Sequence, residues 1–244
     1  MLNLNLPKKN GLFITGTDTG VGKTLITGGI AAVLCSQGLK VGVFKPIASG
    51  CRDEGALVSV DTEFLAMCAG AEYSLNVITP VTYKLPAAPL LCVEIEKRPI
   101  NYEEIVNAYN YLCENTDVVL VEGIGGAMVP IDHEHTVLDL AAAFSLPTVI
   151  VARPNLGTIN HSLLTIEAVR NAGIPVAGLV INGYKALDAD IVEETAPDII
   201  CQFADTNLLS IVPYDEESNV EERQLGEGTV EVLSFCDWQA LSVL

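Results

Sequence analysis

Residues 16–24, which read Gly-Thr-Asp-Thr-Gly-Val-Gly-Lys-Thr, decide the fold of this chain. They follow an apolar run at residues 11–15, which predicts a buried strand, and they precede residues 25–35, which predict a helix. A glycine-bearing loop that ends in Gly-Lys-Thr between a strand and a helix is typical of a phosphate-binding loop. The alternative is a glycine-rich turn without a ligand, and the position of Gly-Lys-Thr at this junction argues against it.

The residue types in this loop suit a bound polyphosphate. Backbone N–H groups at a helix start point toward an anion and carry the positive end of the helix dipole. Gly20 and Gly22 lack a Cβ atom, so the backbone can curl around a phosphate. Lys23 is expected to place its charge on the β- and γ-phosphates, and the Thr24 hydroxyl is expected to bind Mg²⁺.

The loop is one residue longer than the common form. In the pattern GxxxxGK(S/T), the first glycine would stand at position 17, where this chain has Thr17. The upstream glycine is Gly16 instead. The longer spacing favours a subgroup of P-loop enzymes over a GTPase or a motor protein.

Length and charge limit the possible functions. The chain has 244 residues, half of them hydrophobic, and no convincing linker, so we expect a single domain over residues 1–244. Thirteen lysines and arginines face 31 acidic residues, for a formal net charge of -18. Such a chain repels nucleic acid and anionic membranes, and we expect neither as a partner. The mean hydropathy of +0.39 hints at apolar surface covered by a second subunit.

The seven cysteines are scattered and form no CxxC pair. This pattern indicates reduced thiols in a cytoplasmic protein, and neither a zinc site nor a disulfide framework. No signal peptide is evident at residues 1–10, and no apolar run approaches the roughly 20 residues of a membrane helix.

Strand and helix patterns alternate along the chain. The predicted strands are residues 11–15, 40–44, 117–121, 148–152, 176–181 and 208–212. The predicted helices are residues 25–35, 60–69, 102–115, 137–144 and 159–172. We expect the proline-rich residues 73–100 to be irregular and the acidic residues 215–228 to form a surface segment. Strand sequences such as Val-Val-Leu-Val-Glu-Gly are apolar on both faces, which predicts a doubly wound, mainly parallel α/β sheet with helices on both faces, of the P-loop NTPase type.

Polar clusters follow the predicted strands at their carboxyl ends, where open α/β sheets bind ligands. The clusters are residues 17–24, 45–49, 122–126 and 155–160, together with Asn182. Glu122 is placed like the acidic metal ligand of P-loop proteins, although it could instead cap the turn that follows. Lys45 either points into the cleft or is a solvated strand end. Asp61 opens a helix and, from the residues alone, is better explained as a plain N-cap.

Two further clusters leave alternatives open. Residues 155–160 suit a carboxylate at a helix N-terminus, with a simple helix cap as the equal alternative. His133 and His135 could suggest a metal site, but no third ligand is in evidence, so a solvated turn is favoured.

Taken together, these stretches resemble the dethiobiotin synthetase family. The resemblance rests on GTDTGVGKT, FKPIASG, a helix opened by Asp61, VEGIGG, NLGTINH and VING, in this order from Ile14 to about Pro213. It implies a homodimeric α/β P-loop enzyme of biotin synthesis, an ATP-dependent ligase. It implies that 7,8-diaminononanoate, CO₂ and MgATP give dethiobiotin, ADP and phosphate, through a carbamate and a carbamic–phosphoric anhydride.

The resemblance also implies roles for residues of this chain. Lys45 and Lys23 would be catalytic, with Lys45 stabilising charge on the carbamate and on the transferring phosphoryl group. Thr24, Asp61 and Glu122 would hold Mg²⁺. Asn182 would read the adenine of ATP. The residues in contact with ATP would be Thr19, Gly20, Val21, Gly22, Lys23, Thr24, Leu25, Asp61, Glu122, Gly123, Gly125, Asn182 and Pro213. Substrate would contact Ser49 and, from the other subunit, Gly157, Thr158 and Asn160.

Two other functions compete with this interpretation. A cobyrinic-acid-type amidoligase shares the long loop but carries a C-terminal glutaminase domain with a nucleophilic cysteine and a histidine. This chain has no histidine after His161. A partition-type ATPase carries an extra lysine near the start of its loop, where this chain has residues 17–19.

Overall fold

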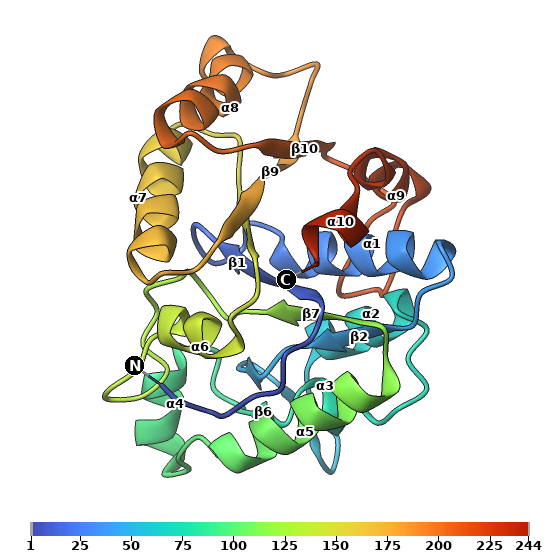
Figure 1. Cartoon of the computed structure of the whole chain (residues 1–244), viewed down its shortest axis with the longest axis vertical. Coiled ribbons are helices and arrows are strands. Elements are labelled where there is room, and N and C mark those ends of the chain that lie inside the picture. Colours follow the sequence, from blue (N-terminus) through green and yellow to red (C-terminus); the bar gives the residue numbers. More distant parts are fainter. Residues whose placement is uncertain (1, 244) are drawn as a thin grey trace.

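The computed structural model describes residues 2–243, which form a parallel sheet with helices on both faces (Figure 1). The main sheet within these residues has the strand order β10-β9-β8-β1-β7-β2, and every neighbouring pair is parallel. Its strands are β1 (Gly11–Gly16), β2 (Val41–Phe44), β7 (Val118–Glu122), β8 (Thr148–Ala152), β9 (Val176–Tyr184) and β10 (Leu208–Pro213). The predicted doubly wound P-loop fold is confirmed.

The helices and the minor strands connect these six strands. The helices are α1 (Lys23–Ser36), α2 (Val60–Cys68), α3 (Leu75–Ile78), α4 (Pro89–Glu96), α5 (Tyr102–Asn115), α6 (Val137–Phe144), α7 (Thr158–Asn171), α8 (Ile191–Ala204), α9 (Glu227–Ser234) and α10 (Trp238–Leu241). The minor strands are β3 (Ile47–Ala48), paired with β6 (Val81–Thr82), and β4 (Arg52–Asp53), paired with β5 (Leu57–Val58).

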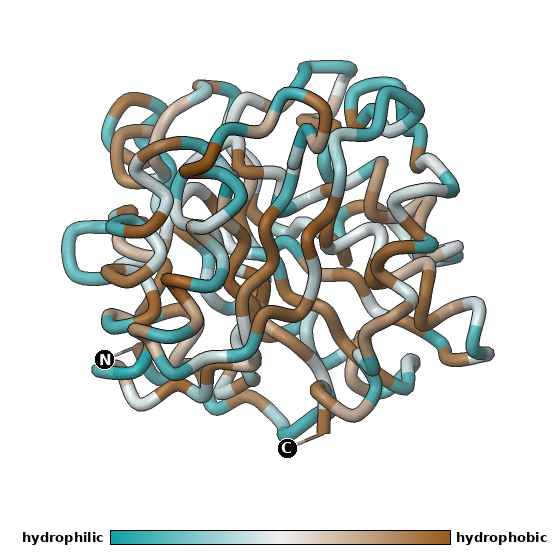
Figure 2. The backbone as a smooth tube through the Cα atoms, turned by 90° about the horizontal axis from the view of Figure 1, so that it is seen from above, coloured by the Kyte–Doolittle hydropathy of each residue, from teal (hydrophilic) through white to brown (hydrophobic). Residues whose placement is uncertain are grey.

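The alternation of side chains along each strand builds two cores, one on each face of the sheet. On β1, Leu12 and Ile14 point into the core under α1, α2, α9 and α10, while Phe13 points into the core under α5, α6, α7 and α8. Figure 1 shows α7 and α8 on one side of the strands and α1, α9 and α10 on the other. In Figure 2 hydrophobic stretches of the chain pass through the interior of the molecule, and most hydrophilic stretches lie in its outer turns.

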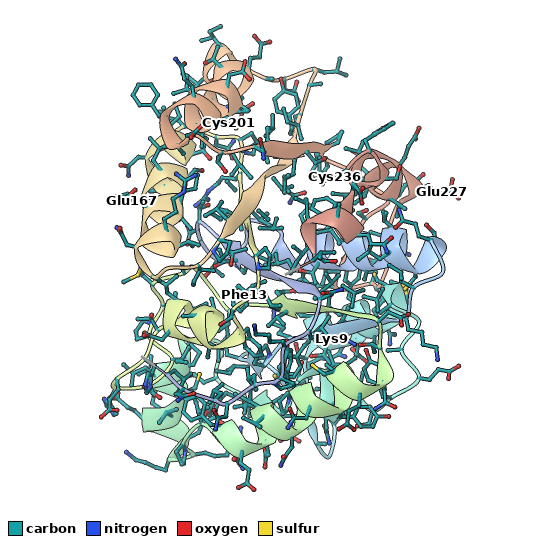
Figure 3. All side chains as sticks on the ribbon, in the orientation of Figure 1. Lys9, Phe13, Glu167, Cys201, Glu227 and Cys236 are labelled. Atoms are coloured by element: carbon teal, nitrogen blue, oxygen red, sulfur yellow. The ribbon has the colours of Figure 1, made fainter. Side chains whose placement is uncertain are left out.

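Figure 3 shows the same contrast for single residues. Phe13 is placed at the centre of the molecule, whereas Glu167 on α7 and Glu227 at the start of α9 lie at its periphery. Because β1 is flanked by β7 and β8, the loop that follows it emerges at the middle of the sheet edge. This position is where ligands bind in doubly wound sheets.

The structure differs from the sequence-based expectations in three places. Residues 73–100 are not irregular, because they contain α3, β6 and α4, and α4 begins at Pro89, where the missing N–H costs no helical hydrogen bond. Helix α8 was not predicted, and it carries Pro197 in its interior. Strand β9 extends to Tyr184, so Asn182 lies within the strand instead of after it.

No helix within residues 2–243 has the length and apolar character needed to cross a membrane.

Candidate functional site

The glycines of the loop between β1 and α1 take backbone conformations that other residues disfavour. Gly20 has φ +75° and Gly22 has φ +93°, and Gly22 stands directly before the first residue of α1. A Cβ atom on Gly22 would lie 2.0 Å from Nδ2 of Asn182. That amide group donates a hydrogen bond of 3.0 Å to the carbonyl oxygen of Val21, so β9 holds the loop from the side. The site therefore requires glycine at position 22 for both space and conformation.

The loop forms one wall of a pocket with a volume of about 440 Å³. The pocket is lined by Thr19, Gly20, Gly22, Lys23, Thr24, Leu25, Lys45, Ser49, Val60, Asp61, Glu122, Ile124, Gly125, Val220 and Glu221. Eleven of the predicted site residues are among these, brought together from the ends of β1, β2 and β7 and from the start of α2. The predicted convergence of polar groups at the carboxyl ends of the strands is thus present in the structure.

Lys23 is buried at the start of α1, with only 7% of its surface exposed. Its Nζ atom donates a 3.0 Å hydrogen bond to the carbonyl oxygen of Asp18, inside the loop. Burial lowers the pKa of Lys23 to about 8, although the carboxylate of Glu122 works in the opposite direction. An anion bound in the loop would favour the charged ammonium.

Lys45 joins the two carboxylates of the pocket. It is 4% exposed, and its Nζ atom donates to Oδ2 of Asp61 and, over 2.7 Å, to Oε1 of Glu122. Burial by itself lowers the pKa of Lys45, but the charges of Glu122 and Asp61 outweigh burial and hold the pKa above its ordinary value. Lys45 is therefore a permanent cation, and its interpretation as a solvated strand end was wrong.

Glu122 and Thr24 offer ligands for a divalent cation. The Thr24 hydroxyl donates a 2.8 Å hydrogen bond to Oε1 of Glu122. The other oxygen of the fully buried Glu122, Oε2, has no hydrogen-bond partner among the described residues. A buried carboxylate oxygen without a partner is costly unless a cation or a donor completes it. A hydroxyl and two carboxylates also match the oxygen ligands that Mg²⁺ prefers, so these residues fit that ion.

The structure excludes two simpler roles for the acidic residues, Asp61 as the N-cap of α2 and Glu122 as a cap of the turn after β7. The N-cap of α2 is Ser59, whose side chain accepts from the N–H of Thr62, so Asp61 is not the N-cap. Glu122 accepts hydrogen bonds from Thr24 and Lys45 through Oε1. These contacts tie it to the pocket and not to the turn after β7.

Several predicted residues lie outside the lining of this pocket. The Val21 side chain of the loop is buried in the core under α1, and Gly123 packs against Phe13 and Val137. Asn182 and Pro213 lie at the carboxyl ends of the neighbouring strands β9 and β10. The Oδ1 atom of Asn182 is buried and, within residues 2–243, has no hydrogen-bond partner. This free acceptor stands next to the loop, beside Gly22.

Residues 157–160 lie at the N-terminus of α7 and do not line the pocket of their own chain. Gly157 is the N-cap with φ +99°, and in the described chain no side chain caps this helix or places an acid in its first turn. Asn160 is exposed, whereas Thr158 is buried with an unpartnered hydroxyl. The exposed N–H groups of the first turn can receive an anion.

Four pocket residues were not among the predicted contacts, although Ile124 lies in the predicted cluster 122–126. They are Val60, Ile124, Val220 and Glu221. The last two belong to the acidic segment after β10, which lies at the surface as predicted but also forms part of the pocket wall. The histidine pair is a turn, as favoured: Nδ1 of His135 lies 3.1 Å from each carboxylate oxygen of Asp132. In the described residues no group of three or more histidines, cysteines or acids could hold a metal.

The fold and the loop define a P-loop nucleotide-binding protein. A family model described as an AAA domain matches residues 10–222. Among solved structures, the MinD protein of Pyrococcus horikoshii in complex with Mg-ADP has a TM-score of 0.55 at 16% identity, with 93% of each chain covered. A ParA family ATPase of Chlorobium tepidum has a TM-score of 0.54 at 15% identity, with 96% of this chain and 99% of that chain covered. These similarities establish the fold alone.

Similarity in sequence is much higher to one family. The ATP-dependent dethiobiotin synthetase BioD of Thermodesulfovibrio yellowstonii is 41% identical over 230 residues, covering 91% of this chain and 95% of the relative. The enzymes of the same name from Bacillus licheniformis and Methanocaldococcus jannaschii are 41% and 37% identical, covering 86% of this chain and 88% and 97% of the relatives. The chain belongs to the ATP-dependent dethiobiotin synthetase family.

Proposed function

We propose that this protein is an ATP-dependent ligase that converts 7,8-diaminononanoate, CO₂ and MgATP into dethiobiotin, ADP and phosphate in biotin biosynthesis. One amine of the substrate adds to CO₂ and gives a carbamate. A carbamate oxygen attacks the γ-phosphorus of ATP and releases ADP. The second amine then attacks the carbonyl carbon of the mixed anhydride, the cyclic urea closes, and phosphate leaves with the bridging oxygen.

The position of Lys45 is the observation that carries this proposal. A buried, permanently charged ammonium lies at the end of β2, between the carboxylates of Asp61 and Glu122 and in the same pocket as Lys23. Carbamate and γ-phosphate are both anions, and they must approach each other for the transfer. A cation fixed in advance between them reduces their repulsion and stabilises the charge that develops on the transferring group.

The nucleotide is proposed to lie along the loop and the neighbouring strand ends. Thr19, Gly20, Gly22 and the first turn of α1 surround the phosphates, and Lys23 leaves the carbonyl of Asp18 to contact them. The free Oδ1 acceptor of Asn182 suits the exocyclic amino group of adenine, beside Pro213. Mg²⁺ would be held by Thr24, Asp61 and Glu122, and it would neutralise charge on the phosphates.

The diamine is proposed to bind beside Ser49, with its carboxylate tail at Gly157, Thr158 and Asn160 of a second subunit. A groove of about 430 Å³ runs between α7 and residues 126–130. Met128 and Leu164 line it and are 63% and 62% exposed, and Leu156 at the start of α7 is 86% exposed. Apolar side chains at such exposure support a homodimer that covers this face.

A mixing experiment tests whether the partner subunit completes the substrate site, by measuring activity instead of molecular mass. Lys45→Gln removes the ammonium group from the pocket of its own subunit. Asn160→Asp places a negative charge at the N-terminus of α7, where it repels the carboxylate tail of the substrate. If the tail site comes from the partner, equimolar mixing of the two weak variants regenerates one intact pocket per heterodimer and raises the activity. If each chain uses its own α7, mixing leaves the activity at the mean of the two.

The reaction itself is tested with ¹³C-bicarbonate. Purified protein with MgATP, the diamine and labelled bicarbonate should form dethiobiotin that carries the label at its urea carbon, with one ADP for each product. Steady ATP hydrolysis at the same rate without the diamine would favour a partition-type ATPase instead. Dependence on glutamine would favour an amidoligase.

We also propose that the chain acts as one P-loop domain in the cytoplasm. The two cores share a single main sheet in the described chain, and all seven cysteines are free thiols, which suits a reducing compartment.

A further inference from the structure

Glu63 lies in the first turn of α2, two residues after Asp61. Its carboxylate forms two ion pairs that have no part in the proposed mechanism. Its Oε1 atom lies 3.3 Å from Nη1 of Arg223, and its Oε2 atom lies 2.5 Å from Nη2 of Arg52. The side chain of Glu63 is 18% exposed, whereas those of Arg52 and Arg223 are 48% and 57% exposed. One half-buried carboxylate thus holds two arginines that come from distant parts of the chain.

Arg223 belongs to residues 215–226, a segment after β10 that we call the C-terminal turn. Val220 and Glu221 of this turn line the pocket beside Gly20 and Leu25. Arg223 lies two residues after Glu221, so its contact with Glu63 anchors the tip of the turn to α2.

The base of the C-terminal turn is held separately. Oδ2 of Asp215 accepts hydrogen bonds from Ser218 and Thr229, and the Ser218 hydroxyl accepts one from the N–H of Gly226. A Cβ atom on Gly226 would lie 2.2 Å from Oδ2 of Asp215, so the two ends of the turn are in close contact. The base is therefore fixed without Glu63. Backbone hydrogen bonds between Asn219 and Gln224 close the tip on itself, and the ion pair of Arg223 with Glu63 ties that tip to α2.

Charge makes this tip contact necessary. The C-terminal turn contains five acidic residues, and Arg223 is its only cation. The first turn of α2, which it faces, contains Asp61 and Glu63. Without Arg223, the five acids of the turn would lie beside Glu63 at the mouth of a pocket that receives a triphosphate, with Arg52 as the remaining cation paired to Glu63. Like charges at short range repel.

The second arginine belongs to the other side of the pocket. Arg52 is the first residue of β4 and lies three residues after Ser49, which lines the pocket. The backbone between them is held by Gly50 and Cys51, whose N–H groups donate to the carbonyl oxygens of Leu85 and Tyr83. The contact of Arg52 with Glu63 ties this stretch to the same helix turn that presents Asp61 to Lys45.

We propose that Glu63 is a positioning residue that closes the C-terminal turn over the nucleotide through Arg223 and fixes residues 49–53 beside it through Arg52. That the bound ligand is ATP rests on the function proposed above, whereas the ion pairs that hold the two segments do not depend on it. Exposed ion pairs contribute little one at a time. Here one carboxylate serves two segments, so its removal releases both, while removal of either arginine releases only one.

The test combines nucleotide binding with hydrogen exchange in the full-length protein. A non-hydrolysable ATP analogue with Mg²⁺ is titrated into wild type, Glu63→Gln, Arg223→Gln, Arg52→Gln and the double variant Glu63→Gln/Arg223→Gln. The matched control is Glu103→Gln, which removes an exposed glutamate from the first turn of α5 and so reproduces the loss of a helix-dipole contact.

We expect Glu63→Gln and Arg223→Gln each to weaken binding of the analogue about threefold to tenfold. The double variant should bind the analogue no more weakly than Glu63→Gln, since coupled residues are not additive. Amide exchange should become faster in residues 219–224 and 49–53 in Glu63→Gln, only in 219–224 in Arg223→Gln, and only in 49–53 in Arg52→Gln. In the dethiobiotin assay, Glu63→Gln should raise the KM for ATP and leave kcat at saturation nearly unchanged.

The proposal is overturned if the amide exchange rates of Glu63→Gln equal those of Glu103→Gln both in the C-terminal turn and in the segment after Ser49. It is also overturned if Arg223→Gln binds the analogue as tightly as wild type. A weaker Glu63→Gln beside an unaffected Arg223→Gln would mean that Glu63 acts only on α2 and Asp61. Failure of wild type to form dethiobiotin would contradict the proposed function, while analogue binding and amide exchange would still decide the role of Glu63.

Discussion

The Nζ atom of Lys45 lies 2.7 Å from Oε1 of Glu122, and both groups are buried. Lys45→Gln keeps a hydrogen-bond donor and loses the charge. We expect kcat to fall on the order of 10²–10³, the usual effect of removing one group that stabilises developing negative charge. Affinity for ATP should fall less, because Lys23 and the N–H groups of the loop remain. Binding of a non-hydrolysable analogue, measured beside kcat, separates the two effects.

The same variant should also be less stable. Removing one partner of a buried ion pair typically costs about 3–5 kcal/mol, because the other charge stays buried. Since Gln retains a donor, the lower part of this range is expected in denaturant unfolding. Lys84→Gln is the control, because the Lys84 side chain is 68% exposed and lies 3.4 Å from Asp53. If the two variants unfold alike, the ion pair of Lys45 contributes no more than a surface pair.

Lys23 should make nucleotide binding depend on pH. Its pKa in the folded protein, about 8, lies below the ordinary value of 10.5. Below about pH 8 the ammonium is charged before ATP arrives, whereas above it the free protein must take up a proton to bind the phosphates. Affinity should therefore fall as the pH rises past 8, and calorimetry in buffers of different ionisation enthalpy should detect proton uptake.

The stability contribution of Lys23 has the opposite sign. Between about pH 8 and 10.5 the unfolded chain binds a proton that the folded chain has lost, so this residue makes folding more favourable as the pH rises. Lys23→Ala should remove both effects and abolish turnover without unfolding the protein. Wild-type proton uptake in the folded Lys23→Ala variant would assign the titration to another group.

Much of this fold could be predicted from sequence because its signals are local. The helix at residues 102–115 has an amphipathic pattern and Asn101 as its N-cap, and it was predicted with its observed bounds. Helix α8 was missed because Pro197 in its interior ordinarily indicates a break. The contact between Glu63 and Arg223 spans 160 positions, and no periodic pattern indicates such a pair. The position of Lys45 depends likewise on β2 and β7 being neighbours, which the sequence order does not reveal.

Gly22→Ala should impair nucleotide binding, an effect beyond the stability cost of placing alanine at a positive φ. The new Cβ atom would lie 2.0 Å from Nδ2 of Asn182, and φ is +93°. Gly38→Ala is the matched control: φ there is +87°, and apart from its chain neighbours no atom of the described residues lies within 4 Å of the added Cβ. We expect the control to cost about 1–2 kcal/mol of stability with normal nucleotide binding, and Gly22→Ala to lose nucleotide binding as well. Equal binding in both variants would show that the contact with Asn182 is dispensable.

Glu122→Gln should weaken the apparent affinity for Mg²⁺ and lower kcat. An amide is a poorer ligand than a carboxylate for a hard cation, and Oε2 of Glu122 is the buried oxygen that lacks a partner in the described chain. A titration of activity against Mg²⁺ at constant ATP checks this. An unchanged midpoint would mean that Glu122 serves only to hold Lys45 and Thr24.

The central claim is that a carbamate held beside Lys45 is the group that ATP phosphorylates, and the fate of its oxygen tests this directly. With ¹⁸O-labelled CO₂, the oxygen that attacks phosphorus must leave with the phosphate when the ring closes. We therefore predict one labelled oxygen in the phosphate formed with each dethiobiotin, and a labelled urea oxygen in the product. Phosphate that takes its new oxygen from water, while labelled CO₂ is consumed, would contradict the account.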